Sequence, residues 1–464
     1  MKLPLWRIAE FVQGVGHYPP DATALGYSID SRTITQGQLF FAVKGERLDG
    51  HDYVQAAFDR GAAAAVIAQD RLAHFPDRSR LLVVGDPLAA LQRLAQMVRC
   101  MWGKPVIGIT GSAGKTTTKE CVAHVLASKY RVLKSEGNLN NHFGLPLQLL
   151  KLEPEHELAV IEMGMSRAGE IAALAKLAQP NTGVVTMVAP VHLEFFDSVK
   201  GIARAKYELI ESLPHGGCAV LNADDDYVSQ FGRDFHGTVL MFGVKRPADV
   251  SAEHVELLGA SGSKFTVCFR EERVPAMMPL IGEHNVYNAL AAVAVALHHG
   301  VPLRQAVDAL NTLQPSDKRG QVLEIGGATV VNDCYNSNPK ALNAMVDALA
   351  KMPANRRIVV AGEMLELGPE GERLHRESGR HVAGKADFVL GVRGLAKATV
   401  DGAKAAGVKA EFVESAEHAG DWLAKNVKPG DAVLLKASRG VKLERALEKW
   451  KEAISRLPLA NDIR

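Results

Sequence analysis

The central part of this chain contains the stretch Val106-Ile107-Gly108-Ile109-Thr110-Gly111-Ser112-Ala113-Gly114-Lys115-Thr116-Thr117-Thr118, in which an apolar strand runs into a glycine-rich turn and a helix start. Glycine lets the backbone turn tightly and brings several N–H groups close to phosphate oxygens. The N-terminus of the following helix adds a dipole that favours anions. The stretch therefore predicts a cradle for the phosphates of a nucleoside triphosphate.

The stretch departs from the usual phosphate-loop pattern, G-x-x-x-x-G-K-[ST], because Ile109 stands where the first glycine belongs. Its glycines fall at Gly108 and Gly111 instead. The alternative is an ordinary strand-to-helix turn that contains Gly-Lys-Thr. In the nucleotide-binding interpretation, Lys115 reaches the β- and γ-phosphates and the Thr116 hydroxyl binds Mg²⁺. The loop by itself does not show how the nucleotide is used.

Length and composition set the broad class. The chain has 464 residues, enough for two to four domains, with 47% hydrophobic and 23% charged residues, as in ordinary globular proteins. A net charge of +2 argues against a nucleic-acid partner. No apolar stretch is long enough to span a membrane, and the N-terminus lacks the apolar run of a signal peptide. The cysteines are odd in number and form no C-x-x-C pair, which favours reduced thiols in a cytoplasmic protein.

Apolar strands alternate with helices along the whole chain, which predicts the α/β class in three domains. Residues 1–102 read as a small N-terminal α/β domain. Residues 103–315 contain the phosphate loop and predict a doubly wound, mostly parallel sheet, with an added antiparallel pair at 266–269. Residues 316–464 repeat the strand–helix–strand pattern and predict a C-terminal Rossmann-like domain.

Three polar residues follow the loop where such a sheet places its active site, just beyond the carboxyl ends of strands. Glu162 ends one strand, His192 follows the next, and Lys206 lies in a helix after it. A carboxylate and an imidazole at neighbouring strand ends can hold a divalent metal near the γ-phosphate. Taken singly, each has an ordinary alternative: a helix-capping glutamate, a structural histidine and a solvated helix lysine.

Together these segments resemble the Mur ligases, the ATP-dependent amide-forming enzymes of bacterial cell-wall precursor synthesis. The resemblance extends through all three domains. It rests on Thr110–Thr117, Glu162-Met163-Gly164, His192-Leu193, Ala205-Lys206-Tyr207-Glu208, Gly282–Ala292, Arg319 and Asn332–Pro339.

The resemblance implies a role for each position. ATP would be held by Gly111, Ser112, Ala113, Gly114, Lys115, Thr116 and Thr117, with Asn288 at the adenine, Arg319 at the phosphates, and Asp333 and Asn336 at the ribose. Two Mg²⁺ ions would be bound, one by Thr116 and Glu162 and a second by Glu162 and His192. Lys206 would react with CO₂ to become a carbamate, an anionic metal ligand. The implied catalytic set is Lys115, Glu162, His192, Lys206 and Arg319.

Other segments are similar to those of the last ligase of this pathway. They include Asn138–Pro146 and two segments with replacements: Ala361–Gly368, where Glu363 replaces aspartate, and Lys436–Gly440, where Ala437 replaces glycine. The Asp30-Ser31-Arg32 turn is similar to the uridine-diphosphate-binding domain of the last two ligases of the pathway. The Asp-Asn-Pro-Arg run of the preceding ligase is absent. This similarity implies that the substrates are UDP-N-acetylmuramoyl-tripeptide and D-alanyl-D-alanine. The implied substrate contacts are Ser31, Arg32, Asn138, Asn141, Ser438 and Arg439.

The implied reaction passes through an acyl phosphate in a monomer whose third domain closes onto ATP. Three alternatives stay open: the preceding ligase, which adds the third amino acid; a folylpolyglutamate synthase-like ligase; and a protein that hydrolyses ATP as a switch. The N-terminal domain speaks against the second. The predicted metal set and the Arg319/Asp333 pair speak against the third.

Overall fold

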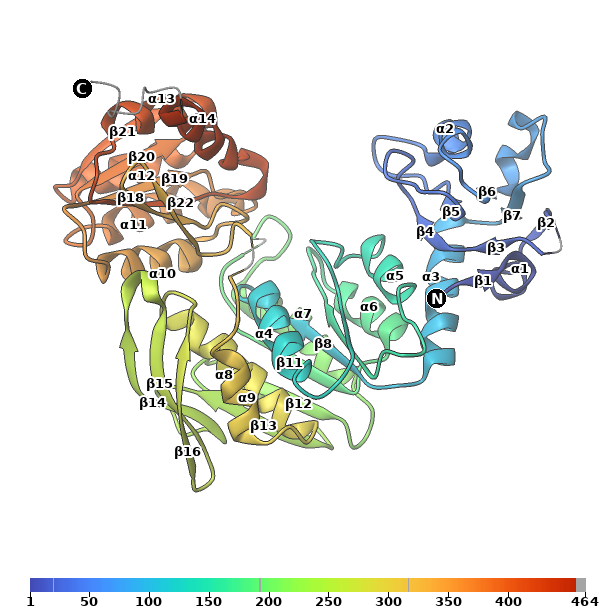
Figure 1. Ribbon diagram of the computed structural model, residues 1–464, viewed down its shortest axis with the longest axis horizontal. Helices are drawn as coiled ribbons and strands as arrows, with labels where there is room; N and C mark the ends of the chain where they lie inside the picture. The colour runs from blue at the N-terminus through green and yellow to red at the C-terminus, as the bar shows by residue number, and fades with distance from the viewer. Residues whose placement is uncertain (20, 192, 316, 456–464) are drawn as a thin grey trace, which may run out of the picture.

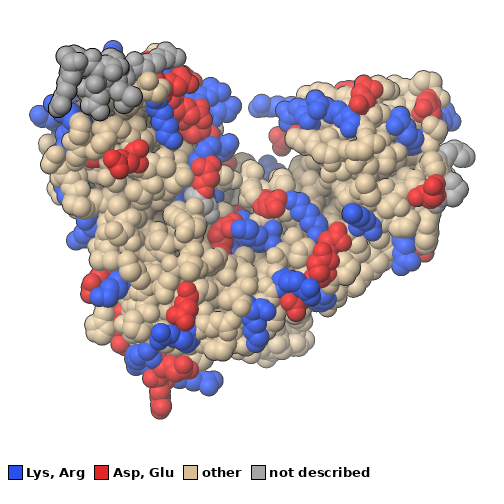
Figure 2. Space-filling view, in the orientation of Figure 1, with Lys and Arg blue, Asp and Glu red and all other residues tan. Residues whose placement is uncertain are grey.

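The chain folds around three large β-sheets that follow one another in sequence, each covered by helices (Figure 1). The computed structural model describes residues 1–19, 21–191, 193–315 and 317–455. The predicted α/β class with three domains is confirmed. Figure 2 shows the molecule hollowed between the N-terminal and C-terminal lobes, with Lys and Arg side chains on both rims.

The first sheet has the order β2-β7-β6-β5-β4, and only β2 is antiparallel to its neighbour. Its strands β5 and β6 are short apolar runs, as is typical of parallel strands covered on both faces. The bounds of this region are β1 (Leu3–Pro4), α1 (Leu5–Val12), β2 (Val15–His17), β3 (Thr23–Ala24), β4 (Gly26–Ser28), β5 (Gln38–Phe41), α2 (Val54–Asp59), β6 (Ala64–Ala68) and β7 (Leu81–Val84).

A single long helix, α3 (Pro87–Trp102), connects the first sheet to the second. Asp86 caps its N-terminus, because the Asp86 carboxylate accepts the Leu88 N–H over 2.8 Å, and Pro87 fits the first helical position. It ends at Gly103, which has the left-handed conformation with φ +69°. The helix packs against α1 on one side and against α5 and α6 of the central domain on the other.

The central sheet has the order β16-β15-β14-β13-β12-β11-β8-β10-β9. Strands β8 to β14 are parallel, and β14, β15 and β16 form the antiparallel end. The strands are β8 (Val106–Thr110), β9 (Val132–Lys134), β10 (Leu158–Glu162), β11 (Thr182–Val185), β12 (Cys218–Asn222), β13 (Thr238–Gly243), β14 (Val250–Leu257), β15 (Ser263–Phe269) and β16 (Glu272–Met278). Because β8 lies between β10 and β11, the strand order reverses there and leaves a crevice beyond its carboxyl end.

Helices cover both faces of the central sheet. One face carries α4 (Lys115–Leu126), α8 (Glu283–His298) and α9 (Leu303–Leu310), and the other carries α5 (Gly144–Leu149), α6 (Glu170–Ala178) and α7 (Val199–Glu211). The helix α8 is buried along most of its length, as its Ala- and Val-rich sequence predicts. Within the described ranges no helix is both long and apolar enough to cross a membrane.

The C-terminal sheet has the order β17-β18-β22-β19-β20-β21, with only β17 antiparallel. Helices α10, α11 and α12 cover one face, and α13 and α14 cover the other. The bounds are β17 (Gln321–Ile325), β18 (Ala328–Asn332), α10 (Pro339–Ala350), β19 (Arg356–Gly362), α11 (Gly371–His381), β20 (Phe388–Val392), α12 (Ala396–Ala405), β21 (Lys409–Val413), α13 (Ala416–Asn426), β22 (Asp431–Lys436) and α14 (Glu444–Ser455).

Candidate active site

The phosphate loop joins β8 to α4 at the crevice of the central sheet. Gly111 has φ +149°, and a Cβ there would lie 1.8 Å from the Thr186 hydroxyl oxygen, so no larger residue fits. The loop is tied to the segment after β11, because the Ser112 N–H donates to Met187 O over 2.9 Å and the Thr186 hydroxyl donates to Ala113 O over 2.6 Å. The backbone cradle is therefore held in shape by its neighbours.

Lys115 is the first residue of α4, and its ammonium donates to the Gly111 carbonyl over 2.7 Å. Burial lowers the pKa of Lys115 from 10.5, while the neighbouring carboxylates of Glu162 and Glu366 favour its charged form. The positive charge thus lies directly over the loop, where a phosphate would be bound.

Glu162 ends β10 with a nearly buried carboxylate. Its Oε1 accepts a hydrogen bond from the Asn140 amide over 2.8 Å, and its backbone N–H donates to the Ser135 hydroxyl over 3.0 Å. Its Oε2 is buried and finds no hydrogen-bond partner in the described part of the chain. A buried carboxylate oxygen that accepts no hydrogen bond suits a hard cation such as Mg²⁺.

The described part of the chain offers this cation few other ligands. No cluster of three or more His, Cys, Asp or Glu side chains is found among the described residues. His192, predicted as a metal ligand, lies outside the described residues. Mg²⁺ is commonly bound by one or two carboxylates together with the phosphates of its nucleotide, so the donor set around Glu162 and Thr116 fits a nucleotide-dependent site.

Lys206 projects from α7 into the interior, and the residue is 1% exposed. Burial lowers its pKa well below 10.5, and the positive charge of Lys115 lowers it further. The helix is held in register by Glu208, whose carboxylate accepts the Gly169 N–H over 2.7 Å and the Ala172 N–H over 3.0 Å at the start of α6. The site thus contains a buried lysine amine that is easily deprotonated.

Asn288 lies on α8, directly over the phosphate loop. Its amide oxygen accepts the Thr118 hydroxyl over 2.9 Å, and its amide nitrogen donates to the Asn285 side chain over 2.8 Å. A Cβ on Gly114 would approach that oxygen to 2.8 Å. The structure therefore brings Asn288 to the nucleotide loop, and its contact with adenine stays a prediction.

Arg319 crosses from the C-terminal side of the chain to the phosphate loop. Its Nη2 donates to the Thr116 hydroxyl over 2.9 Å, and its guanidinium lies 4.0 Å from the centre of the Tyr335 ring. The guanidinium of Arg439 lies 5.8 Å from the same ring. Tyr335 falls within the Asn332–Pro339 motif but had no predicted role; its side chain is the platform for Arg319.

Asp333 and Asn336, predicted at the ribose, are joined by Lys436. The Lys436 ammonium is 2.5 Å from the Asp333 carboxylate and donates to the Asn336 carbonyl over 3.0 Å. Nearby on α8, burial lowers the pKa of His284 to about 4. Its Nδ1 has no partner within the residues described. The contacts of Lys436 hold Asp333 and Asn336 in place relative to each other. The contacts of these two residues with the ribose remain predictions.

The Arg32 and Asn141 side chains, which are predicted to contact substrate, have partners within the protein itself. The Arg32 guanidinium pairs with Asp30 over 2.7 Å and is largely exposed, whereas Ser31 is buried. Asn138 and Asn141 are exposed near the α5 start, where the Asn141 side chain accepts the Gly144 N–H over 2.9 Å. Their substrate roles stay predictions.

Two further predicted substrate residues follow β22. The Ser438 hydroxyl donates to Ser337 O over 3.2 Å and accepts the Leu365 N–H over 2.9 Å. Arg439 pairs with Glu444 over 2.6 Å. Ser438 therefore holds the 363–368 loop in place, a role that its sequence motif did not indicate.

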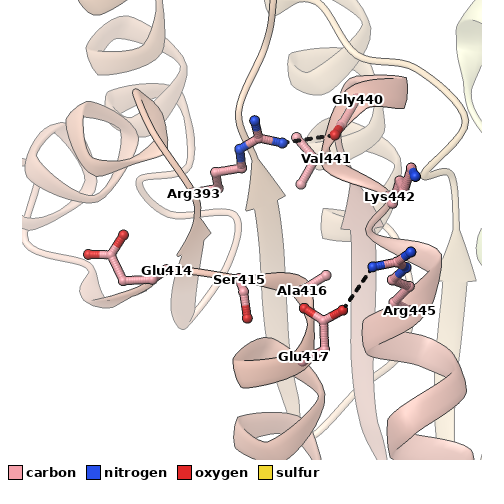
Figure 3. A pocket seen from close by; sticks show the side chains of 9 residues that line it. All are labelled: Arg393, Glu414, Ser415, Ala416, Glu417, Gly440, Val441, Lys442 and Arg445. Carbon is pink, nitrogen blue, oxygen red and sulfur yellow. Dashed lines mark hydrogen bonds and ion pairs between the residues drawn. The ribbon is translucent and has the colours of Figure 1, made fainter.

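Sequence reasoning missed an open cavity of about 390 Å³ at the carboxyl ends of β20, β21 and β22 (Figure 3). The Arg393 guanidinium donates to the Gly440 carbonyl over 2.8 Å, and Arg445 pairs with Glu417 over 3.3 Å. With Lys442, three cations and two carboxylates surround the cavity, which suits a small ligand that carries an anionic group. Its lining comes from separate segments, namely Arg393, Glu414–Glu417, Gly440–Lys442 and Arg445.

Comparison with known proteins identifies the family. Three family models match in order: "Mur ligase family, catalytic domain" at residues 25–101, "Mur ligase middle domain" at 109–296, and "Mur ligase, glutamate ligase domain" at 318–439. The chain is 35% identical over 451 residues to UDP-N-acetylmuramoyl-tripeptide--D-alanyl-D-alanine ligase from Bacillus subtilis (strain 168), covering 96% of this chain and 97% of that one. It is 35% identical over 397 residues to the Escherichia coli (strain K12) ligase of the same name, covering 85% and 86%.

Solved structures agree with these matches. MurF from Acinetobacter baumannii superposes with a TM-score of 0.87 at 30% identity, covering 97% of this chain and 99% of that one. MurF from Thermotoga maritima, solved in complex with ADP, superposes with a TM-score of 0.81 at 30% identity, covering 93% and 98%. Matches in sequence and in structure thus extend through all three domains, and this chain belongs to the Mur ligase family.

Proposed function

We propose that this protein joins D-alanyl-D-alanine to UDP-N-acetylmuramoyl-tripeptide at the expense of ATP. One observation carries the proposal: relatives that bear the name of this ligase are 35% identical over 96% of the chain. The geometry supports it, because the C-terminal domain reaches the phosphate loop through Arg319. A nucleotide switch has no need of a third domain at its phosphates, so a ligase with a second substrate fits better.

In the proposed reaction, the terminal carboxylate of the tripeptide attacks the γ-phosphorus of ATP, and ADP leaves. Lys115 and the backbone N–H groups of the loop stabilise the charge on the transferred phosphoryl group. Two Mg²⁺ ions would neutralise the phosphates, held by Thr116, by the buried Oε2 of Glu162 and by His192. The amine of the dipeptide then attacks the acyl phosphate, and inorganic phosphate leaves.

The buried amine of Lys206 supports the proposal that this residue is carbamylated. Because burial lowers its pKa, the neutral amine that can add to CO₂ with loss of a proton forms more readily than in an exposed lysine. The product carries a negative charge beside the ammonium of Lys115, where a second positive charge is unfavourable. Its oxygens would provide an anionic group for the metal.

In this proposal the protein is a monomer, and each of its three domains binds a different substrate. Residues 1–102 would bind the uridine diphosphate part, residues 103–315 the ATP, and residues 316–464 the dipeptide. In this proposal the cavity lined by Arg393, Lys442 and Arg445 would take the dipeptide carboxylate. A cytoplasmic location, expected from the unpaired cysteines, is kept as part of this proposal.

The test is phosphate release from ATP by the purified protein with Mg²⁺ and UDP-N-acetylmuramoyl-tripeptide. We expect release to depend on D-alanyl-D-alanine and to yield a product heavier by the dipeptide minus water. Release that ignores the dipeptide but responds to a diamino acid with the UDP-dipeptide would assign the preceding step instead. No response to any muramoyl substrate would refute the proposal.

A further inference from the structure

The two oxygens of the Glu162 carboxylate are not equivalent. Oε1 accepts a hydrogen bond from the Asn140 side chain over 2.8 Å, whereas Oε2 is buried without a hydrogen-bond partner among the described residues. Glu162 is only 3% exposed, so bulk water is largely excluded from the group. The protein therefore engages one oxygen and leaves the other for a ligand such as the Mg²⁺ of the proposed reaction.

The group that engages Oε1 is the amide nitrogen of Asn140. An ionised carboxylate accepts hydrogen bonds and donates none, so the Asn140 side chain must face it with its Nδ2–H. The Asn140 Oδ1 is directed at Gly164, where a Cβ would lie 2.7 Å from that oxygen. A side chain at position 164 would displace the amide, so the glycine allows Asn140 to reach Glu162.

The main chain holds Asn140 beside the end of β10. The Gly164 N–H donates to the Asn140 carbonyl over 2.9 Å, and the Asn140 N–H donates to the Asn138 carbonyl over 2.8 Å. The Glu162 N–H donates to the Ser135 hydroxyl over 3.0 Å. The amide and the carboxylate are thus each anchored by their own backbone contacts before they meet.

A hydrogen bond to Oε1 affects how the carboxylate can bind a metal. The donor competes with a cation for Oε1 and leaves Oε2 free, which favours binding through a single oxygen. Mg²⁺ suits this mode, because it requires near-octahedral geometry at about 2.0–2.1 Å and keeps waters and phosphates among its ligands. Ca²⁺ is larger, takes about six to eight ligands, and often binds both oxygens of one carboxylate.

We propose that Asn140 is a positioning residue that makes this site selective for Mg²⁺ over larger divalent cations. It engages Oε1, so that Glu162 presents Oε2 alone to the metal beside the ATP phosphates. The inference rests on the proposed function for the use of ATP, but not for the identity of the amine that is joined. Its neighbours Asn138 and Asn141 are predicted substrate contacts, so one short loop would serve both the metal and the substrate.

The experiment measures binding of the two ions directly, in the full-length protein with a non-hydrolysable ATP analogue. Equilibrium dialysis of radiolabelled Ca²⁺, with Mg²⁺ as the competitor, gives both affinities without turnover. Asn140→Ala removes the donor, and Asn140→Asp keeps the shape of the side chain but cannot donate. Ser135→Ala is the matched control, because it removes the partner of the Glu162 N–H and leaves the bond from Asn140 to the carboxylate in place.

We expect Asn140→Ala to weaken Mg²⁺ binding about 10- to 100-fold, the usual effect of losing a group that orients a metal ligand. Ca²⁺ binding should change by less than about threefold, because the freed Oε1 offers that ion a second ligand. Asn140→Asp should shift the ratio of the two affinities in the same direction, although its added charge attracts both ions. Ser135→Ala should keep the wild-type ratio, even at reduced stability.

An equal loss of Mg²⁺ and Ca²⁺ binding in Asn140→Ala would overturn the inference, because Asn140 would then only support the fold. Wild-type affinities for both ions in both Asn140 variants would overturn it as well, as would a wild-type protein that binds neither ion with the nucleotide. Shifted ratios in a protein that never ligates D-alanyl-D-alanine would support the inference and refute the proposed function. The two failures are therefore distinguishable.

Discussion

Arg319 and Thr116 are 203 positions apart in the sequence, yet the guanidinium of one donates to the hydroxyl of the other over 2.9 Å. The same hydroxyl is predicted to bind Mg²⁺. Arg319 thus lies where the charge of a transferred phosphoryl group would develop, and the contact joins the C-terminal part of the chain to the phosphate loop.

Arg319→Ala should lower kcat for ATP-dependent ligation by about 10³-fold, the scale on which a phosphate-directed arginine acts. Arg319→Lys should recover little, because an ammonium lacks the planar fork of the guanidinium. Steady-state phosphate release measures both. Arg304→Ala, which removes an exposed arginine beside Asp308, is the control. A loss below threefold in Arg319→Ala would remove the arginine from the mechanism.

Tyr335→Leu should lower kcat about 2- to 30-fold, because a ring under a guanidinium contributes about 0.5–2 kcal/mol to its placement. Tyr335→Phe keeps the ring and should stay close to wild type. Steady-state kinetics at saturating ATP separate the two variants. If kcat falls as far in Tyr335→Phe as in Tyr335→Leu, the hydroxyl is required and the explanation by stacking is wrong.

Lys206→Met should abolish ligation yet raise the free energy of unfolding of the nucleotide-free protein in CO₂-free buffer. Because the folded-state pKa lies below 10.5, the unfolded chain binds a proton that the folded chain lacks, and wild-type stability rises with pH up to about that value. The variant has no such titration, so its advantage should shrink as pH rises toward 10.5.

Urea unfolding at several pH values measures this difference. Lys200→Met, on the exposed face of the same helix, is the matched control and should show no pH-dependent gain. A destabilised Lys206→Met protein would show that the amine is held by favourable contacts instead. Carbamylation itself can be followed by ¹³C NMR with labelled bicarbonate, whose carbamate signal should be absent in Lys206→Met.

Lys436→Met should destabilise the C-terminal domain by about 3–5 kcal/mol, because it leaves the Asp333 carboxylate buried without its cation. The double variant with Asp333→Asn should recover much of this loss, since no unpaired charge remains. Amide hydrogen exchange in β18 and β22 reports the stability of this domain. Additive losses in the two single variants would show that the pair is not coupled.

The parallel strands could be predicted from the sequence because each is a short apolar run followed by a helix. The apolar strand predicted before the phosphate loop corresponds to β8, Val106–Thr110, and the added antiparallel strand predicted at 266–269 lies within β15, Ser263–Phe269. The hairpin of β17 and β18 was missed. The sequence signal was the Gly326-Gly327 pair. Both glycines have positive φ in the structure, as a tight two-residue turn requires.

The side-chain pairs of the site could not be predicted in the same way. Lys436 meets Asp333 across 103 positions, and Ser438 holds Leu365 across 73. Such pairs depend on the order of strands in the sheet, which local patterns do not determine. The motif around Ser438 indicated an important segment, but only the fold shows that its hydroxyl faces the protein's own backbone.

The position of Arg319 along the chain has one more consequence. It lies in the connection between α9, which ends at Leu310, and β17, which begins at Gln321. If the C-terminal domain turns about this connection, a residue beside the pivot moves less than Arg393, which follows the carboxyl end of β20. Fluorescent labels near each position would show the contrast as a small and a large distance change. The nucleotide would then stay bound by Arg319 while the cavity at Arg393 moves to take up its peptide.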